Sequence, residues 1–205
     1  MGIDWKKLEA IVKAELQGEK TGHDFKHTKR VLKHALRIAK HHKEADLEIL
    51  KSACWLHDIS CGKHGTKEHH LKSAEMAGQM LQKLGMKEAK IPKVKESIID
   101  HCARFNPTGK KWAEFTIETR IHRDADEIDA LGYIGLARMI TYSASQGWPY
   151  FKSKNDKVDV SLYGNVKYLA KWPETMMTPE GKKIGKEKTK ILLQFMKGLE
   201  TEIKD

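Results

Sequence analysis

The sequence predicts an all-α fold, a single-domain helical bundle. Apolar residues recur every three to four positions along most of the 205 residues, which is the period of one helix face. Short alternations of apolar and polar residues also occur, but hairpin turn signals bracket none of them, so we expect no strand. A content of 40% hydrophobic and 32% charged residues suits one core under a charged surface.

The first three helices follow from their apolar stripes and their caps. Residues 3–17 carry a helical stripe, and a longer helix begins at Phe25. A third helix begins after Asp46, a residue type favoured at the N-cap, and it is apolar nearly all round. We therefore expect this third helix to lie at the centre of the fold and to deliver His57 and Asp58 into the interior.

The rest of the chain carries further helical segments: one that ends near Gly85, one opened by Pro92, a long one from about Phe115 to Ser145, a short one through Leu162 and Leu169, and a final one after Thr178-Pro179. Residues 147–160 are expected to form an ordered surface loop. We interpret residues 1–205 as one domain, with a core over about 20–145 and a C-terminal helical part over about 146–205.

Charge and cysteine content narrow the function classes. The chain has 38 Lys and Arg against 28 Asp and Glu, a net charge of +10, but the basic residues are spread along the chain. We interpret them as solvated helix faces that leave a positive field for anionic substrates, so nucleic acid is not the favoured partner. Three cysteines without a CxxC pair indicate neither a disulfide framework nor a thiolate zinc knuckle. No stretch approaches the ~18 apolar residues of a membrane span, so we predict a soluble, cytoplasmic protein without a membrane partner.

The candidate site is organised around Trp55-Leu56-His57-Asp58, with His27 upstream and Asp126 downstream. Imidazole nitrogens and carboxylate oxygens, without thiolates, suit a divalent cation that keeps positions open for water and substrate, such as Mn, Fe, Zn, Co, Ni or Mg. Such an ion lowers the pKa of bound water and polarises a phosphoryl oxygen. The pattern therefore indicates a metal-dependent hydrolase.

These residues resemble the H…HD…D signature of the HD-domain metal-dependent phosphohydrolases. The segment His23-Asp-Phe-Lys-His27-Thr-Lys-Arg30-Val31 is similar to the family's first motif, and Leu56-His57-Asp58-Ile59 is similar to the second. The last motif is similar to Asp124-Ala-Asp126-Glu-Ile-Asp129-Ala-Leu-Gly-Tyr-Ile-Gly. The ending from Tyr168 to Gly181 resembles that of a small bacterial and archaeal subgroup in which nucleoside triphosphate pyrophosphohydrolase activity is known.

The resemblance covers residues from about 20 to the end. It implies a helical fold, a metal held by His27, His57, Asp58 and Asp126, and cleavage of a phosphoester or phosphoanhydride bond. Asp126 is carried over because the family's pattern is Ala-Asp-x-x-Asp. Helix periodicity alone leaves Asp124 open as the last ligand, since residues two apart on a helix face different ways.

Two more histidines extend the resemblance. Some branches of the family hold a second metal with histidines between the His-Asp pair and the last aspartate, and His70 and His101 sit at comparable places. They could hold a second ion roughly 3.5 to 4 Å from the first. They could instead contact the substrate or a metal-bound water, and we favour that interpretation.

Three residues are further candidates for phosphate binding or catalysis. Lys63 follows the His-Asp pair in a loop, Arg30 lies one turn past His27, and Asp129 lies one turn past Asp126. A solvent-exposed position without a role in the site explains each of them equally well. For Lys63 there is a further difference, because this chain has Cys61 at the position where one branch of the family has its lysine. We expect the remaining histidines to lie on the surface: His34, His41, His42, His64, His69 and His122.

Our leading hypothesis is a phosphohydrolase that uses one divalent ion, or two, to cleave a small phosphorylated metabolite, with a nucleotide favoured. The alternative is a non-catalytic sensor of nucleotides or nucleic acid that keeps a structural metal site. Strong, salt-dependent binding to RNA or DNA without turnover would favour the sensor. The sequence does not predict the oligomeric state.

Overall fold

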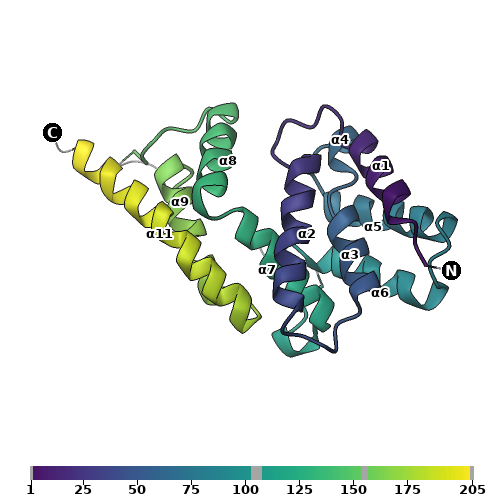
Figure 1. The fold of residues 1–205 in the computed structure, drawn as a ribbon. Coiled ribbons are helices and arrows are strands. Elements are labelled where there is room, and N and C mark those ends of the chain that lie inside the picture. The colour runs from purple at the N-terminus through teal and green to yellow at the C-terminus, as the bar shows by residue number, and fades with distance from the viewer. Residues whose placement is uncertain (1, 103–107, 154–156, 204–205) are drawn as a thin grey trace. The chain divides into compact units, whose positions relative to one another are not determined.

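The computed structural model describes residues 2–102, 108–153 and 157–203, and every regular element within these ranges is a helix (Figure 1). The predicted all-α fold class is therefore confirmed. No helix in the described ranges is long and apolar enough to cross a membrane. The chain forms two compact units, residues 1–126 and 127–205. A single domain with a core over about 20–145 stays a prediction.

The first unit begins with helices whose starts are fixed by aspartate caps. The carboxylates of Asp4, Asp24 and Asp46 each accept hydrogen bonds from N–H groups in the first turn of the helix that follows. The elements that start in this unit are α1 (Trp5–Glu15), α2 (Phe25–Ala39), α3 (Leu47–Leu56), α4 (Cys61–His64), α5 (His69–Lys83), η1 (Glu88–Lys90), α6 (Ile91–Asp100), η2 (Trp112–Glu114) and α7 (Ile117–Asp129).

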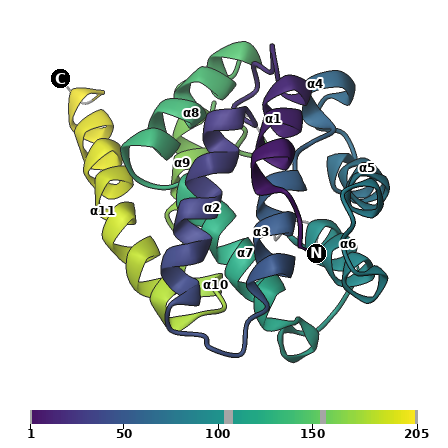
Figure 2. The same ribbon diagram turned by 45° about the vertical axis from the view of Figure 1, so that its right-hand side comes forward.

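Helix α3 is the centre of the first unit, as its apolar sequence predicts. It packs against α2, α6 and α1, while α5 lies along α6 (Figures 1 and 2). Leu50, Leu56 and Ile59 are fully buried, and each such side chain contributes about 1.5–3 kcal/mol through burial. The end of α3 is therefore held rigidly where His57 and Asp58 leave the helix.

The second unit is built along the final helix. Its helices are α8 (Gly132–Ser145), α9 (Leu162–Leu169), α10 (Trp172–Thr175) and α11 (Pro179–Glu202), and α11 packs against the other three. Figure 1 shows α11 in yellow beside α9. The hydroxyl of Thr178 caps α11 by accepting the N–H of Gly181 at 3.0 Å, with Pro179 in the first position. These contacts confirm the predicted start of the helix.

The single long helix expected from 115 to 145 was wrong, because α7 and α8 are separate. Gly132 has a φ of +72°, a left-handed conformation in which an α-helix cannot continue. Gly135 then lies so close to Ala130 that a Cβ at this position would meet the Ala130 carbonyl at 2.1 Å. Gly132 and Gly135 thus allow the chain to break between α7 and α8. The apolar periodicity does not indicate this break, because the helical pattern continues on both sides of it.

Candidate metal centre

Three separate segments of the first unit deliver the predicted ligands. His27 lies in the first turn of α2, where its N–H donates to the Asp24 cap at 2.7 Å. His57 and Asp58 follow the last residue of α3. Asp126 lies near the end of α7. His27, His57 and Asp58 are at most 2% exposed, whereas the side chain of Asp126 is 28% exposed.

The donor atoms of these four residues converge. The Nε2 atoms of His27 and His57 lie 3.2 Å apart. Oδ2 of Asp58 lies 3.3 Å from Nε2 of His27 and 3.1 Å from Nε2 of His57. Oδ1 of Asp126 lies 3.3 Å from Nε2 of His27 and 3.9 Å from Nε2 of His57. The structure therefore brings Asp126 to the cluster, with one oxygen facing both imidazoles.

The ring of His57 is oriented by a backbone carbonyl. Its Nδ1 donates to the carbonyl oxygen of Cys54 at 3.0 Å, one turn back in α3. Because a carbonyl only accepts, Nδ1 carries the proton, and in the neutral ring Nε2 keeps its lone pair. This is the tautomer that a metal ligand needs.

The buried charges of the cluster support one another. Burial alone would raise the pKa of Asp58, but the charges of His57 and His23 and the hydrogen bond from His27 hold it well below its usual range. Burial also opposes ionisation of Asp126, yet His27 and His57 lower its pKa strongly. Burial would lower the pKa of His57, and the two carboxylates reverse this and raise it. Both carboxylates are therefore anionic at neutral pH.

A second set of donor atoms surrounds the other oxygen of Asp58. Oδ1 of Asp58 lies 3.4 Å from Nε2 of His69 and 3.9 Å from Nε2 of His101. These two nitrogens are 3.3 Å apart, and Cys102 Sγ lies beside both of them. Burial and the neighbouring His57 lower the pKa of His101 to about 3. The imidazole of His101 is therefore neutral at neutral pH.

Among the residues that the structure describes, two buried atoms in this region have no hydrogen-bond partner. They are Oδ1 of Asp58 and Nε2 of His122. The other ring nitrogen of His122, Nδ1, forms a hydrogen bond with Ser97 Oγ at 3.1 Å. The ring centroids of His122 and His57 lie 5.1 Å apart. A buried carboxylate oxygen without a donor costs free energy. A histidine–aspartate network held together by hydrogen bonds alone would not leave Oδ1 of Asp58 without a donor.

The residues fit a divalent cation. Ligand atoms about 2.0–2.2 Å from one ion are roughly 2.9–3.5 Å apart, and most of the distances around His27, His57, Asp58 and Asp126 fall in that range. Two imidazole nitrogens that face each other at 3.2 Å also need a proton or a cation between them, since their lone pairs repel. Nitrogen and oxygen donors suit Mn, Fe, Co, Ni, Zn or Mg and leave the choice open.

Of the other predicted site residues, His101 lies beside Asp58, whereas His70 and Lys63 make their contacts elsewhere. Among the described residues, His70 belongs to none of the groups of converging donors, and its ring packs against His69 with centroids 5.8 Å apart. Lys63 is 61% exposed and forms an ion pair with Glu15 at 2.6 Å. Asp129, in the second unit, binds Arg138 at 2.8 Å. Arg30 is half-buried on α2.

Two histidines expected on the surface lie at the cluster instead. His122 is fully buried, and His69 reaches Asp58 with a side chain only 14% exposed. For His122 the signal was present in the sequence, because it lies four residues before Asp126 and shares its helix face. His69 was missed because the apolar stripe of α5 favoured its neighbour His70. Cys102 was passed over because it lacks a second cysteine at zinc-ligand spacing.

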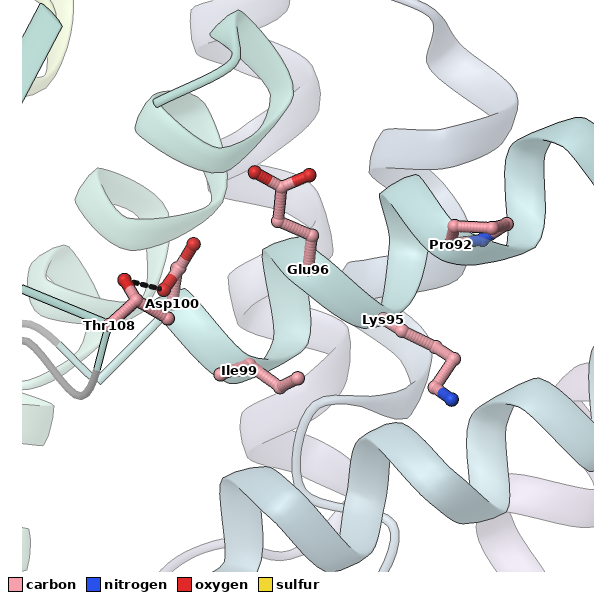
Figure 3. Close-up of a pocket in the computed structure, with 6 residues that line it drawn as sticks. All are labelled: Pro92, Lys95, Glu96, Ile99, Asp100 and Thr108. Atoms are coloured by element: carbon pink, nitrogen blue, oxygen red, sulfur yellow. Dashed lines mark hydrogen bonds between the residues drawn. The ribbon is translucent and has the colours of Figure 1, made fainter. Parts of the chain in front are cut away.

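A hollow of about 290 Å³ is lined by residues other than the candidate ligands, although one of them, Asp100, directly precedes His101 in the chain. It is lined by Pro92, Lys95, Glu96, Ile99, Asp100 and Thr108 (Figure 3). In Figure 3 Asp100 accepts a hydrogen bond from Thr108, at 2.6 Å, and it also pairs with Lys110 at 2.9 Å. The Asp100 carboxylate thus lies at this hollow, where it binds Thr108 and Lys110, while its neighbour His101 lies at the candidate metal centre.

Comparison with known proteins agrees with this geometry. The family model described as HD domain matches residues 24–131. The chain is 28% identical over 199 residues to the uncharacterized protein YpgQ of Bacillus subtilis, covering 96% of this chain and 92% of that protein.

Solved structures share the fold. The crystal structure of YpgQ in complex with ADP superposes with a TM-score of 0.75 at 23% identity, covering 96% of this chain and 93% of that one. An HD-superfamily hydrolase of Bacillus thuringiensis gives 0.74 at 23% identity, covering 97% and 96%. A protein of Lactobacillus plantarum gives 0.81 at 20% identity over the same shares of the two chains.

Proposed function

This chain belongs to the HD-domain family, and on that premise we propose that it is a metal-dependent phosphohydrolase. It cleaves a phosphoester or phosphoanhydride bond of a small phosphorylated metabolite, with a nucleotide as the favoured substrate. The observation that carries the proposal is the convergence of His27 Nε2, His57 Nε2, Asp58 Oδ2 and Asp126 Oδ1 inside the helical core.

In this proposal His27 and His57 hold the cation through Nε2, and Asp58 and Asp126 hold it through their carboxylates. When bound, a divalent cation supplies a Lewis acid that activates water and polarises a phosphoryl oxygen. The hydrogen bond from His57 to Cys54 keeps the ring from turning. Three of the four ligands, His27, His57 and Asp58, are almost fully buried, which limits water near the ion and strengthens its electrostatic interactions with a phosphate.

Nucleotide as the substrate class has two supports. The YpgQ relative was crystallised in complex with ADP. The net charge of +10 gives the protein a positive field that attracts anions of this kind. Lys63 and Arg30 stay proposed phosphate contacts, and Lys63 would have to leave its ion pair with Glu15 to make one. Asp129 stays a proposed catalytic residue.

The test is a hydrolysis screen. The full chain, loaded with Mn²⁺, is incubated with a panel of nucleoside mono-, di- and triphosphates, and released phosphate and pyrophosphate are measured. We expect turnover that His57→Ala and Asp58→Ala each reduce at least a hundredfold, since both residues supply donor atoms. His41→Ala, at an exposed histidine, is the matched control and keeps full activity. Activity that survives both ligand variants rules the proposal out.

The same screen separates the proposal from a sensor without catalysis. Nucleotide binding that is tight, metal-dependent and free of turnover across the whole panel would favour the sensor. Binding to RNA or DNA that weakens steeply with salt would favour a nucleic-acid partner.

A further inference from the structure

Helix α2 carries a continuous row of cations on its exposed face. Every charged residue from Phe25 to Lys43 is basic, and no aspartate or glutamate interrupts this segment of the sequence. The exposed cations recur three or four residues apart, which places them on one face of the helix. They are Lys26, Lys29, Lys33, Arg37 and Lys40, and together they are called the basic stripe.

The basic stripe lies opposite the buried face of its helix. On the buried face Val31, Ala35 and Ile38 are fully enclosed, and α2 packs there against α3. With a rise of about 1.5 Å per residue, the stripe from Lys26 to Lys40 is about 21 Å long. Because the packing on α3 holds the helix in place, the cations form a straight, ordered row on the surface of the first unit.

Most of the charge on the basic stripe is not neutralised within the molecule. Lys29 forms an ion pair with Glu9 of α1 at 3.2 Å, but both side chains are exposed and such surface pairs are weak. In the part of the chain that the structure describes, no carboxylate pairs with Lys33, Arg37 or Lys40. Like charges three or four residues apart repel one another along a helix. A partner that supplies a row of anions would relieve this repulsion.

The basic stripe offers charge without apolar anchors. Among the described residues, none of the exposed large hydrophobic side chains belongs to α2, and the ring of Phe25 stacks on Trp55 with centroids 5.9 Å apart. Protein–protein interfaces centre on aromatic and apolar side chains, and proteins that bind single strands stack the bases on exposed aromatic rings. A nucleic-acid duplex can be bound through its phosphates alone. The chemistry of the stripe therefore favours duplex phosphates.

We propose that the basic stripe of α2 docks this protein on the phosphate backbone of a nucleic-acid duplex, without regard to base sequence. Each strand carries one phosphate for about every 3.4 Å of the duplex axis, so a stripe of about 21 Å spans about six base pairs. The net charge of +10 is spread along the sequence, but the fold of α2 gathers part of it on one face. The stripe lies on a different face of α2 from the proposed ligand His27, so docking requires neither a metal ion nor turnover.

The test measures binding of the full chain to a labelled DNA duplex of mixed sequence by fluorescence anisotropy. The duplex lacks terminal phosphates and a chelator is present, so that the proposed metal centre does not contribute. We expect wild-type binding to weaken roughly a hundredfold between about 50 and 200 mM NaCl, as about four phosphate contacts require. The triple variant Lys33→Ala, Arg37→Ala and Lys40→Ala should raise the Kd at the lower salt concentration at least tenfold. Alanine favours the helix, and circular dichroism shows that the helical content is kept.

The matched control removes three exposed lysines of α5 and α6: Lys72→Ala, Lys83→Ala and Lys93→Ala. This control has the same net charge as the stripe variant, and we expect its Kd for the duplex to stay within about threefold of the wild type, because phosphate contacts are local. Equal losses in the two triple variants overturn the proposal, as does a wild type without salt-dependent duplex binding. Binding to vesicles of anionic phospholipid without binding to the duplex also overturns it, and would assign the stripe to a membrane surface.

The result is separable from that of the hydrolysis screen. We expect the stripe variant to keep wild-type turnover of nucleotides. His57→Ala should lose turnover and keep the wild-type Kd for the duplex, since it lies in the core and not on the stripe. Duplex binding without turnover in the wild type would leave the stripe assigned and remove the proposed function. Turnover without duplex binding would do the reverse.

Discussion

The Nε2 atoms of His27 and His57 lie 3.2 Å apart, although 30 residues separate them in the chain. One ring is placed by the capped start of α2 and the other by the buried end of α3. Two nitrogens held at this distance with two carboxylates around them are preorganised for one cation. Because the packing of two helices fixes their separation, we expect binding of the proposed cation to be coupled to the stability of the fold.

Removal of the metal is expected to lower thermal stability. A ligand at a hundred times its Kd stabilises the folded state by about 2.7 kcal/mol, which in a chain of this size is roughly 5–10 °C in Tm. Thermal unfolding with Mn²⁺ and with a chelator measures the difference. His57→Ala is expected to lose most of it and His41→Ala none. Equal shifts in wild type and His57→Ala would contradict a site at these residues.

The choice between the two aspartates of α7 can be settled by metal affinity. Asp126→Asn replaces an oxygen that faces both imidazoles, so we expect the Kd for Mn²⁺ to rise at least tenfold. Asp124 is buried but its carboxylate belongs to none of the converging groups among the described residues. Asp124→Asn should therefore keep the wild-type Mn²⁺ affinity in calorimetric titration. The opposite ranking would move the ligand to Asp124.

The cap of α3 is expected to contribute to stability in a pH-dependent way. Asp46 accepts the N–H groups of Glu48 and Ile49 and pairs with Lys90 at 2.7 Å. Asp46→Ala should cost about 1 kcal/mol in urea unfolding, whereas Asp46→Asn keeps the cap and most of the stability.

The sign of the pH effect follows from the pKa. Burial would raise the pKa of Asp46, but Lys90 and the N–H groups of Ile49 and Glu48 outweigh burial and lower it. The stabilisation by the ionised carboxylate is thus present above a pH of about 4 and is lost as the pH falls through the lowered pKa. The advantage of wild type over Asp46→Asn should narrow on acidification. An advantage that grows in acid would contradict this assignment.

Gly62 should be irreplaceable for steric reasons. A Cβ there would lie 2.2 Å from the backbone oxygen of Glu15, so α4 would have to move away from the end of α1. We expect Gly62→Ala to destabilise the protein by about 1–3 kcal/mol. Gly198→Ala is the matched control, since no atom would lie within 4 Å of its Cβ, and it should be neutral or stabilising by up to about 1 kcal/mol. Urea unfolding measures both, and equal stability of the two variants would contradict the close approach.

Much of the fold was predictable from local signals. The caps at Asp46 and Thr178 and the all-apolar α3 are properties of a few adjacent residues, and the structure confirms them. The break between α7 and α8 was missed, because it depends on the backbone conformation of Gly132 and not on hydrophobic periodicity. The sequence Asn106-Pro107-Thr108-Gly109 also predicts a polar loop, of which Asn106 and Pro107 lie outside the described residues.

The helical class, the buried end of α3 and the histidines and aspartates of the candidate metal centre were predictable from the residues alone, because they follow from periodicity, caps and residue chemistry. Which donors meet depends on the tertiary structure: Oδ1 of Asp126 faces the imidazoles of His27 and His57, and His69, beside Cys102, reaches the second oxygen of Asp58. Convergence to within 4 Å depends on how helices pack and turn about their axes, and one residue of rotation exchanges His69 for His70. The rotation of each helix about its axis is set by contacts between segments that are distant in the sequence, so a local sequence pattern does not predict it.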